Sequence, residues 1–251
     1  MSHPAPPPGN GFPGIDGLPQ STGGSPRNRL ADALRRIGSV AVGHPLADDD
    51  VAEAADQLAQ IADTLEHGAP PTKRPRAQPI PTAHPQDFFP SSPMIGFANP
   101  VAPPAEVWAV AGENGQREIR GRVTFDYPFE GPPTCVHGGI IAELFDELMG
   151  AANLIADQPG MTGTLTVRYR RPTPLLAPLD LVARYTGGER RKIFTWAGIY
   201  HEGELTAEAE GIFIKMDPDR LLDIATRNAL AANEQVIDQD FAELIAKRED
   251  S

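Results

Sequence analysis

Within residues 106–216, one long stretch with apolar residues at helical spacing lies between stretches in which apolar and polar residues alternate as in β-strands. This order constrains the fold more than any other feature of the chain. Before the helix, EVWAVAG and REIRGRVTFD flank a Gly-Glu-Asn-Gly turn and predict a hairpin. After it come four runs rich in β-branched and aromatic residues, TGTLTVRYRRP, LDLVARYTGG, RKIFTWAGIYHEG and ELTAEAEGIFIKM. In the first run Leu165, Val167 and Tyr169 alternate with polar residues, which predicts a strand with one buried face. A long helix against an antiparallel sheet is an α+β layer.

The composition of the remaining chain predicts four further segments. Residues 1–27 contain seven Pro and six Gly, so too little apolar surface is available to offset chain entropy and disorder is expected. Residues 28–68 have apolar residues at helical spacing and predict a helical pair. Residues 69–105 contain eleven Pro in 37 positions and predict an extended strap or linker, with DFFPSSPMIGF as apolar anchors. The main domain is then 106–217, and helical spacing returns in a C-terminal helical tail at 218–251.

The charge of the chain limits the classes of partner. A formal charge of -12 and a pI near 4.9 argue against a nucleic-acid binder, which needs clustered Lys and Arg. Within this acidic chain, residues 162–192 hold seven Lys or Arg and two acids, and such a basic strip indicates an anionic ligand. The single Cys135 excludes an internal disulfide, and neither a signal segment nor an apolar run of membrane-spanning length is found. A cytoplasmic location is expected.

The stretch VHGGIIAELFDELMG, residues 136–150, holds the candidate site. Gly138 and Gly139 allow another group to approach the backbone, and the first N–H groups of a helix suit a developing oxyanion. A tight loop-to-helix turn that needs glycine only for its conformation is the alternative. Asp146 lies in an apolar helical stripe, where a carboxylate is costly unless it has a use or a partner. Alternatively, Glu143, Asp146 and Glu147 form one solvated face.

The spacing between His137 and Asp146 predicts a composite site. Nine residues of helix rise roughly 13 Å, so the two side chains leave opposite sides of the helix. Within one chain they cannot easily serve the same substrate atom. If both are functional, a two-fold dimer would bring the Gly138 end of one subunit to Asp146 of the other.

Three stretches, HGGIIAELFDELMG, TGTLTVRYRRPTPL and GGERRKIFTWAGIYHEGELTAEAEGIFIKM, resemble acyl-CoA thioesterases of the hotdog fold, of the phenylacetate-degradation (PaaI-like) type. The resemblance runs from about Val107 to Met216. It implies a long central helix wrapped by an antiparallel β-sheet, here with N- and C-terminal helical extensions. It also implies subunits that pair by joining their sheets, as a homodimer or homotetramer, and a site at the subunit interface.

The resemblance also implies a role for each site residue. Asp146 becomes the catalytic carboxylate, acting as general base on water or attacking the thioester carbonyl. Gly138 supplies the backbone N–H of an oxyanion hole, and Gly139 lies beside it at the substrate. Thr162 occurs where the family has a Ser or Thr that positions the attacking water. His137 orients the thioester or shapes the oxyanion hole; alternatively, it is a loop histidine satisfied by backbone.

The substrate implied by the resemblance is an acyl-CoA, whose phosphates would meet the basic strip. Arg170, Arg190 and Lys192 are the expected substrate-binding residues, and the alternative for each, a solvated surface charge, is the commoner case for a single Arg or Lys. No cofactor is expected, and no metal, because the six His lack metal-ligand spacing.

One departure from the family pattern keeps other functions open. Six residues before His137 the family often has Asn or Gln at the reacting centre, whereas this chain has Gly131. A non-catalytic acyl-CoA-binding module with a partner-binding extension is therefore the main alternative. A hotdog hydratase fits less well, because that chemistry usually sets an Asp ahead of a His. A serine hydrolase lacks its G-x-S-x-G motif, and Cys135 is not placed in line with His137 for proton transfer.

Overall fold

The computed structural model describes residues 25–68, 90–103, 105–112 and 116–215 of the chain. The elements in chain order are helices α1 (Pro26–Gly43) and α2 (Asp48–Gly68), strands β1 (Glu106–Ala111) and β2 (Arg117–Thr124), the short 3-10 helix η1 (Tyr127–Phe129), helix α4 (Gly138–Ile155), and strands β3 (Gly160–Tyr169), β4 (Pro178–Glu189), β5 (Lys192–His201) and β6 (Glu204–Lys215). The predicted order of two strands, one helix and four strands is confirmed.

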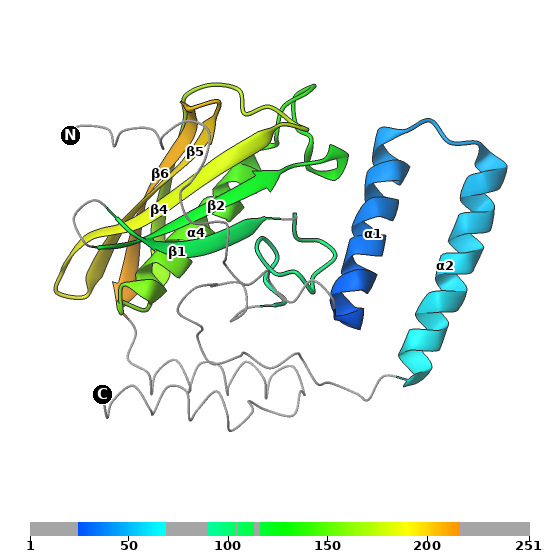
Figure 1. Cartoon of the computed structure of the whole chain (residues 1–251), viewed down its shortest axis with the longest axis horizontal. Coiled ribbons are helices and arrows are strands. Elements are labelled where there is room, and N and C mark those ends of the chain that lie inside the picture. The colour runs from blue at the N-terminus through cyan, green and yellow to red at the C-terminus, as the bar shows by residue number, and fades with distance from the viewer. Residues whose placement is uncertain (1–24, 69–89, 104, 113–115, 216–251) are drawn as a thin grey trace.

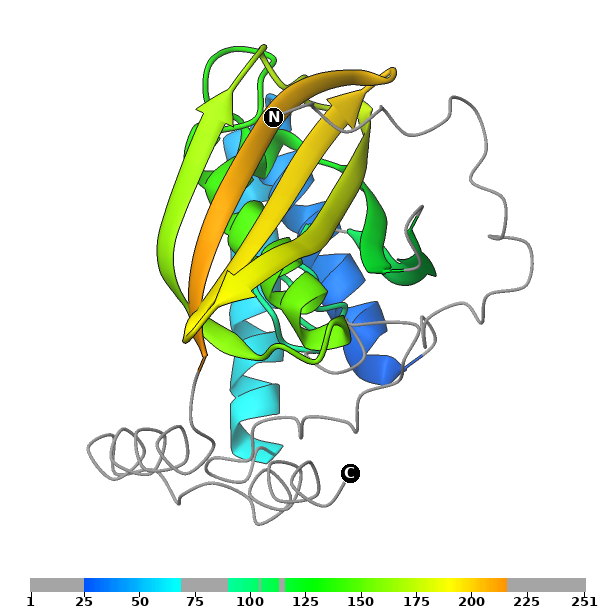
Figure 2. The same ribbon diagram turned by 90° about the vertical axis from the view of Figure 1, so that its left-hand side faces the viewer.

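The strands form one six-stranded antiparallel sheet in the order β1-β2-β4-β5-β6-β3. Helix α4 lies along one face of this sheet, as Figures 1 and 2 show from two directions. Apolar side chains of α4 fill the space between helix and sheet, and they include Ile141, Leu144, Phe145, Leu148 and Met149. A long helix wrapped by an antiparallel sheet is the arrangement that the resemblance implied, and the predicted α+β architecture is confirmed.

Strand β3 lies at the edge of the sheet, where it pairs only with β6 among the described strands. The predicted alternation is present at Leu165 and Val167, which are half-buried against the main core while the intervening Thr166 is exposed. Tyr169 departs from it and is 54% exposed. An exposed ten-residue edge offers unpaired backbone groups to another strand.

Residues 90–103, called the docked loop from here on, are folded into consecutive turns rather than the extended strap expected from the proline content. Short backbone bonds close these turns, such as the one from the Ala98 N–H to the Pro90 carbonyl at 2.9 Å. Gly96 is required there, because a Cβ on it would come within 2.6 Å of the same Pro90 oxygen. Met94 and Ile95 are buried in the main core, as expected of anchors.

The two N-terminal helices differ in how they contact the rest of the protein. Helix α1 packs beside η1 and the docked loop, and Ser39 on it donates a hydrogen bond to Asp126 at 2.5 Å. Helix α2 has no buried residue. None of the helices in the described ranges has the length and hydropathy to span a membrane. The predicted disordered N-terminus up to residue 24, the linker up to residue 89 and the tail at 218–251 fall outside the described residues.

Candidate active site

Helix α4 begins at the predicted glycine pair, and His137 is its N-cap. The Gly139 N–H donates to His137 Nδ1 at 3.0 Å, which satisfies one of the exposed donors at the helix start. This contact matches the alternative in which His137 is satisfied by backbone, and its role toward a substrate stays a prediction. The N–H of Gly138 has no acceptor among the described residues. It is therefore a donor at this helix end that remains available to an oxyanion.

Tyr169, at the end of β3, fixes the position of Gly138. Its hydroxyl donates to the Gly138 carbonyl oxygen at 2.7 Å. A Cβ on Gly138 would lie 3.2 Å from that hydroxyl, so the tyrosine fits closely against a residue without a side chain. The sequence did not identify Tyr169 as a site residue, because its alternation with Leu165 and Val167 indicated only burial.

Asp146 is half-buried, and Thr162 Oγ1 donates to its Oδ1 at 2.6 Å. The structure thus brings together two residues that were predicted to share a site. The strand register shifts between Thr162 and Thr164, and such a bulge changes the direction in which a side chain points. This bond holds one Asp146 oxygen, and no cation in the described part of the chain forms an ion pair with the carboxylate.

The three acids of α4 do not form one solvated face. Glu143 is exposed, whereas Glu147 is half-buried beneath the docked loop. Burial raises the pKa of Glu147 above its ordinary value of 4.5, a hydrogen bond with the Ser92 side chain opposes this rise, and the nearby Asp146 and Glu143 charges add to it. A desolvated carboxyl one residue from Asp146 was not predicted from the sequence, which carries no sign of the loop above it.

Glu147 gives a prediction for the pH dependence of stability. Its pKa is higher in the folded protein than in the unfolded chain, so its neutral form contributes stability that is fully present below about pH 4.5 and is lost as pH rises through the raised pKa. In Glu147→Gln the side chain is neutral at every pH. The free energy of unfolding of this variant, relative to that of the wild type, should therefore increase as the pH is raised from about 4 to about 8. Urea unfolding across this range measures the difference. The exposed Glu143→Gln is the matched control, and equal slopes for both variants would contradict the prediction.

The two parts of the site lie far apart within one chain. Gly138 contacts Tyr169 near the end of β3, and Asp146 contacts Thr162 near its start. Seven residues of strand separate Thr162 from Tyr169, which is about 23 Å. Eight residues of helix separate Gly138 from Asp146, which is about 12 Å. One carbonyl group cannot be held by both parts of the same chain.

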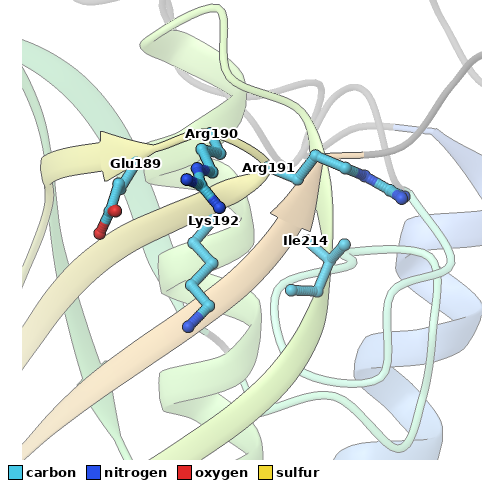
Figure 3. Close-up of a pocket in the computed structure, with 5 residues that line it drawn as sticks. All are labelled: Glu189, Arg190, Arg191, Lys192 and Ile214. Carbon is cyan, nitrogen blue, oxygen red and sulfur yellow. The ribbon is translucent and has the colours of Figure 1, made fainter.

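A basic pocket opens at the hairpin between β4 and β5. Its cavity of about 410 Å³ is lined by Glu189, Arg190, Arg191, Lys192 and Ile214 (Figure 3). Among the described residues, no ion pair is formed by the three cations of this pocket.

Strand register places this pocket near Thr162. Phe213 on β6 lies opposite Thr162 on β3 and, on its other side, opposite Ile193 on β5. Lys192 directly precedes Ile193 in the chain. Two strand spacings, about 10 Å, separate Thr162 from Ile193. Two of the predicted phosphate ligands, Arg190 and Lys192, therefore lie at the same end of the sheet as Asp146.

Arg170, the third predicted phosphate ligand, lies elsewhere and already has a partner. Its Nε donates to Glu208 Oε1 at 2.9 Å, and the same carboxylate accepts from Trp196 Nε1 at 3.1 Å. Glu208 is 3% exposed, so this acid depends on its donors for stability. These contacts give Arg170 a role in the fold, and its predicted contact with phosphate stays a prediction.

Glu208→Ala is expected to lower the free energy of unfolding by about 2 kcal/mol, because Trp196 and Arg170 lose a buried acceptor. Glu210→Ala is the matched control. It removes the surface pair between Arg168 and Glu210, both about half exposed, and should cost less than about 1 kcal/mol. Denaturant unfolding measures both variants, and a loss at Glu208 no larger than that at Glu210 would contradict this role.

Gly131 has a packing reason in this structure. A Cβ on it would lie 2.7 Å from the His137 Cα, closer than real side chains approach backbone. The loop is held there by a bond from the His137 N–H to the Phe129 carbonyl at 2.9 Å. An Asn or Gln at this position would displace the residue that caps α4, so the missing amide is tied to how this loop is built.

Comparison with known proteins identifies relatives in both sequence and structure. Acyl-coenzyme A thioesterase THEM4 of Xenopus laevis is 37% identical over 91 residues, and that of Mus musculus is 36% identical over 95 residues. These matches cover 36% and 37% of this chain and 41% of each relative, so the chain spans less than half the length of these curated relatives. No family model matches the chain. A crystal structure of a thioesterase superfamily protein is 33% identical, with a TM-score of 0.66, over 76% of this chain and 91% of that chain.

The chain belongs to the thioesterase superfamily. Its relationship to a solved member extends over 76% of the chain, well beyond the sequence match to the THEM4 enzymes. The hotdog resemblance read from the sequence is thereby confirmed, and so is the hotdog fold.

Proposed function

We propose that the protein is an acyl-CoA thioesterase of the PaaI-like type, which hydrolyses a thioester to a free acid and CoA. One observation carries the proposal. The Asp146 carboxylate, on the central helix α4 of a thioesterase superfamily chain, accepts a hydrogen bond at 2.6 Å from Thr162 on β3. The name of the THEM4 relatives supports the same reaction. The catalytic unit is the predicted domain 106–217, with the helical pair 28–68 and the docked loop as additions.

Asp146 acts on the thioester carbonyl in one of two ways. As a general base it accepts a proton from water, and the water oxygen forms a bond to the carbonyl carbon. As a nucleophile its own oxygen forms that bond, and water later hydrolyses the anhydride. In both routes the C–S bond breaks, the CoA thiolate leaves and takes up a proton, and the acid is released. The Gly138 N–H stabilises the oxyanion.

The site is completed by a second copy of the chain. If β3 pairs antiparallel with β3 of another copy about a two-fold axis midway between Thr162 and Tyr169, each Thr162 lies opposite the other Tyr169. Asp146 then meets the Gly138 N–H of the second copy. The exposed edge of β3 supports this pairing, which gives a homodimer with two composite sites and leaves room for a dimer of dimers.

The CoA phosphates bind the pocket at the β4–β5 hairpin. Arg190 and Lys192 line it, carry no ion pair among the described residues, and lie near the end of the sheet that holds Thr162. Guanidinium and ammonium groups bind phosphate through charge-assisted hydrogen bonds. Arg170 is not among the residues that line this pocket, and Glu208 holds its guanidinium.

Free-thiol release from short, aromatic and long acyl-CoAs tests the proposal. A thioesterase should release CoA from at least one class at a rate above the uncatalysed hydrolysis. Binding of acyl-CoA without thiol release would instead establish the non-catalytic binding module, for which the absence of an amide at Gly131 is the supporting observation. Addition of water to an unsaturated acyl-CoA would establish the hydratase.

A further inference from the structure

Hydrogen bonds on the N-terminal side of Gly138, the proposed oxyanion donor, hold the loop that leads into α4. The His137 N–H donates to the Phe129 carbonyl oxygen at 2.9 Å, and the His137 carbonyl oxygen accepts from the Ile141 N–H at 3.2 Å. The Gly139 N–H donates to His137 Nδ1 at 3.0 Å. These bonds all run through His137, so they fix the residue before the donor.

Tyr169 ties Gly138 itself to the sheet, because its hydroxyl donates to the Gly138 carbonyl oxygen at 2.7 Å. The backbone that carries this side chain is held by β6. Tyr169 is the last residue of β3 that pairs with β6, and the N–H groups of Arg170 and Arg171, which follow it, donate to the Thr206 carbonyl oxygen at 2.8 and 2.9 Å. The hydroxyl therefore extends from a fixed strand end to the first turn of α4.

The hydrogen bond between Tyr169 and Gly138 adds little to stability but defines a position. Tyr169 is 54% exposed, so water competes for both the hydroxyl and the carbonyl oxygen. The fit is nevertheless close, since a Cβ on Gly138 would lie 3.2 Å from the hydroxyl oxygen. A close contact with little stabilising value at the start of the site helix points to a role in the site.

In the proposed dimer this contact lies inside the composite site. Tyr169 of one copy is opposite Thr162 of the other copy, whose hydroxyl holds Asp146. The Gly138 N–H must then point at the carbonyl oxygen of a thioester that lies within reach of that carboxylate. A misplacement of about 1 Å in such an alignment can lower a rate about 10²-fold.

We propose that Tyr169 is a positioning residue, whose hydroxyl holds the Gly138 carbonyl group and thereby directs the Gly138 N–H at the developing oxyanion. The inference rests on the proposed thioesterase function and adds to it a residue at the end of β3. Tyr169 acts through Gly138, so its effect on the reaction requires that the Gly138 N–H is present.

Tyr169→Phe removes the hydroxyl and keeps the ring. We expect kcat for acyl-CoA hydrolysis to fall about tenfold while KM stays within about twofold, because the oxyanion forms only in the transition state. The matched control is Tyr200→Phe. Tyr200 belongs to a second apolar cluster with Val182 and Trp196, separate from the core that contains α4, and its loss of a hydroxyl should leave kcat unchanged.

A double-mutant cycle with Gly138→Pro separates positioning from a general structural effect. In Gly138→Pro the donor that Tyr169 positions is already absent. Adding Tyr169→Phe to it should therefore lower kcat by less than about twofold, rather than by a second factor of ten. A structural role of the tyrosine would give the full loss in both backgrounds.

Each other outcome overturns the inference. An unchanged kcat in Tyr169→Phe would mean that the hydroxyl does not position the donor, and a tenfold loss that persists in the Gly138→Pro background would mean that it acts independently of Gly138. Loss of the fold or of the dimer in Tyr169→Phe, followed by thermal unfolding and size-exclusion chromatography, would give the residue a structural role instead. Absence of thiol release by the wild type would reject the proposed function itself, and the inference with it.

Discussion

Replacing Asp146 with asparagine is expected to lower kcat for acyl-CoA hydrolysis about 10³-fold while leaving the fold intact. Asparagine keeps the shape of the side chain and can still accept the hydrogen bond from Thr162, so packing around α4 is preserved. What it loses is the ability to take a proton from water or to attack the carbonyl. Steady-state thiol release gives kcat, and circular dichroism with thermal unfolding checks the fold.

Glu143→Gln is the control for this substitution, because Glu143 is an exposed acid on the same helix. It makes the same change of charge three residues away and should keep kcat within about twofold of the wild type. Equal losses in the two variants would mean that the negative charge of the helix matters rather than a catalytic carboxylate. A fully active Asp146→Asn would exclude both proposed routes.

Gly138→Pro is the second substitution with a large expected effect, a loss of about 10²-fold to 10³-fold in kcat. Proline removes the Gly138 N–H, which has no acceptor among the described residues, while the first position of a helix tolerates proline well. His137 has ψ of 132°, which is also the backbone region that a residue before proline prefers. The oxyanion donor is thus removed with little cost to α4.

Gly138→Ala separates the missing donor from the added side chain. Alanine adds the same Cβ, 3.2 Å from the Tyr169 hydroxyl, and keeps the N–H. It should retain activity within about tenfold of the wild type. If alanine and proline reduce kcat equally, the contact with Tyr169 rather than the Gly138 N–H would explain the loss.

The elements of the main domain could be predicted from the sequence because their periodicity is local. The alternation in β4, β5 and β6 and the apolar stripe of α4 each lie within one continuous stretch, and each element is present in the structure. The position of β3 at the edge of the sheet was not predictable in the same way, because it depends on the order of the strands rather than on the residues of one strand. Leu165, Val167 and Tyr169 alternate as a half-buried strand would, yet the strand order β5-β6-β3 leaves them at the rim of the sheet.

The site was predictable where one motif contains it and not where distant segments meet. The glycine pair and Asp146 lie in one motif, and the resemblance supplied Thr162. The hydrogen bond from Tyr169 to Gly138 joins residues 31 positions apart, and the bonds from Arg35 to the docked loop join residues 62 to 67 apart. The pairing of Arg170 was not predicted for the same reason, since its partner Glu208 lies 38 residues away.

The composite site is tested most directly by a heterodimer of Asp146→Asn and Gly138→Pro, purified through a different tag on each chain. If each site takes Asp146 from one chain and the Gly138 N–H from the other, one site carries both substitutions and the other carries neither. The heterodimer should then recover about half of the wild-type kcat per dimer, although each variant alone is nearly inactive. Activity no higher than that of the separate variants would show that each site is built from a single chain, and would contradict the composite site.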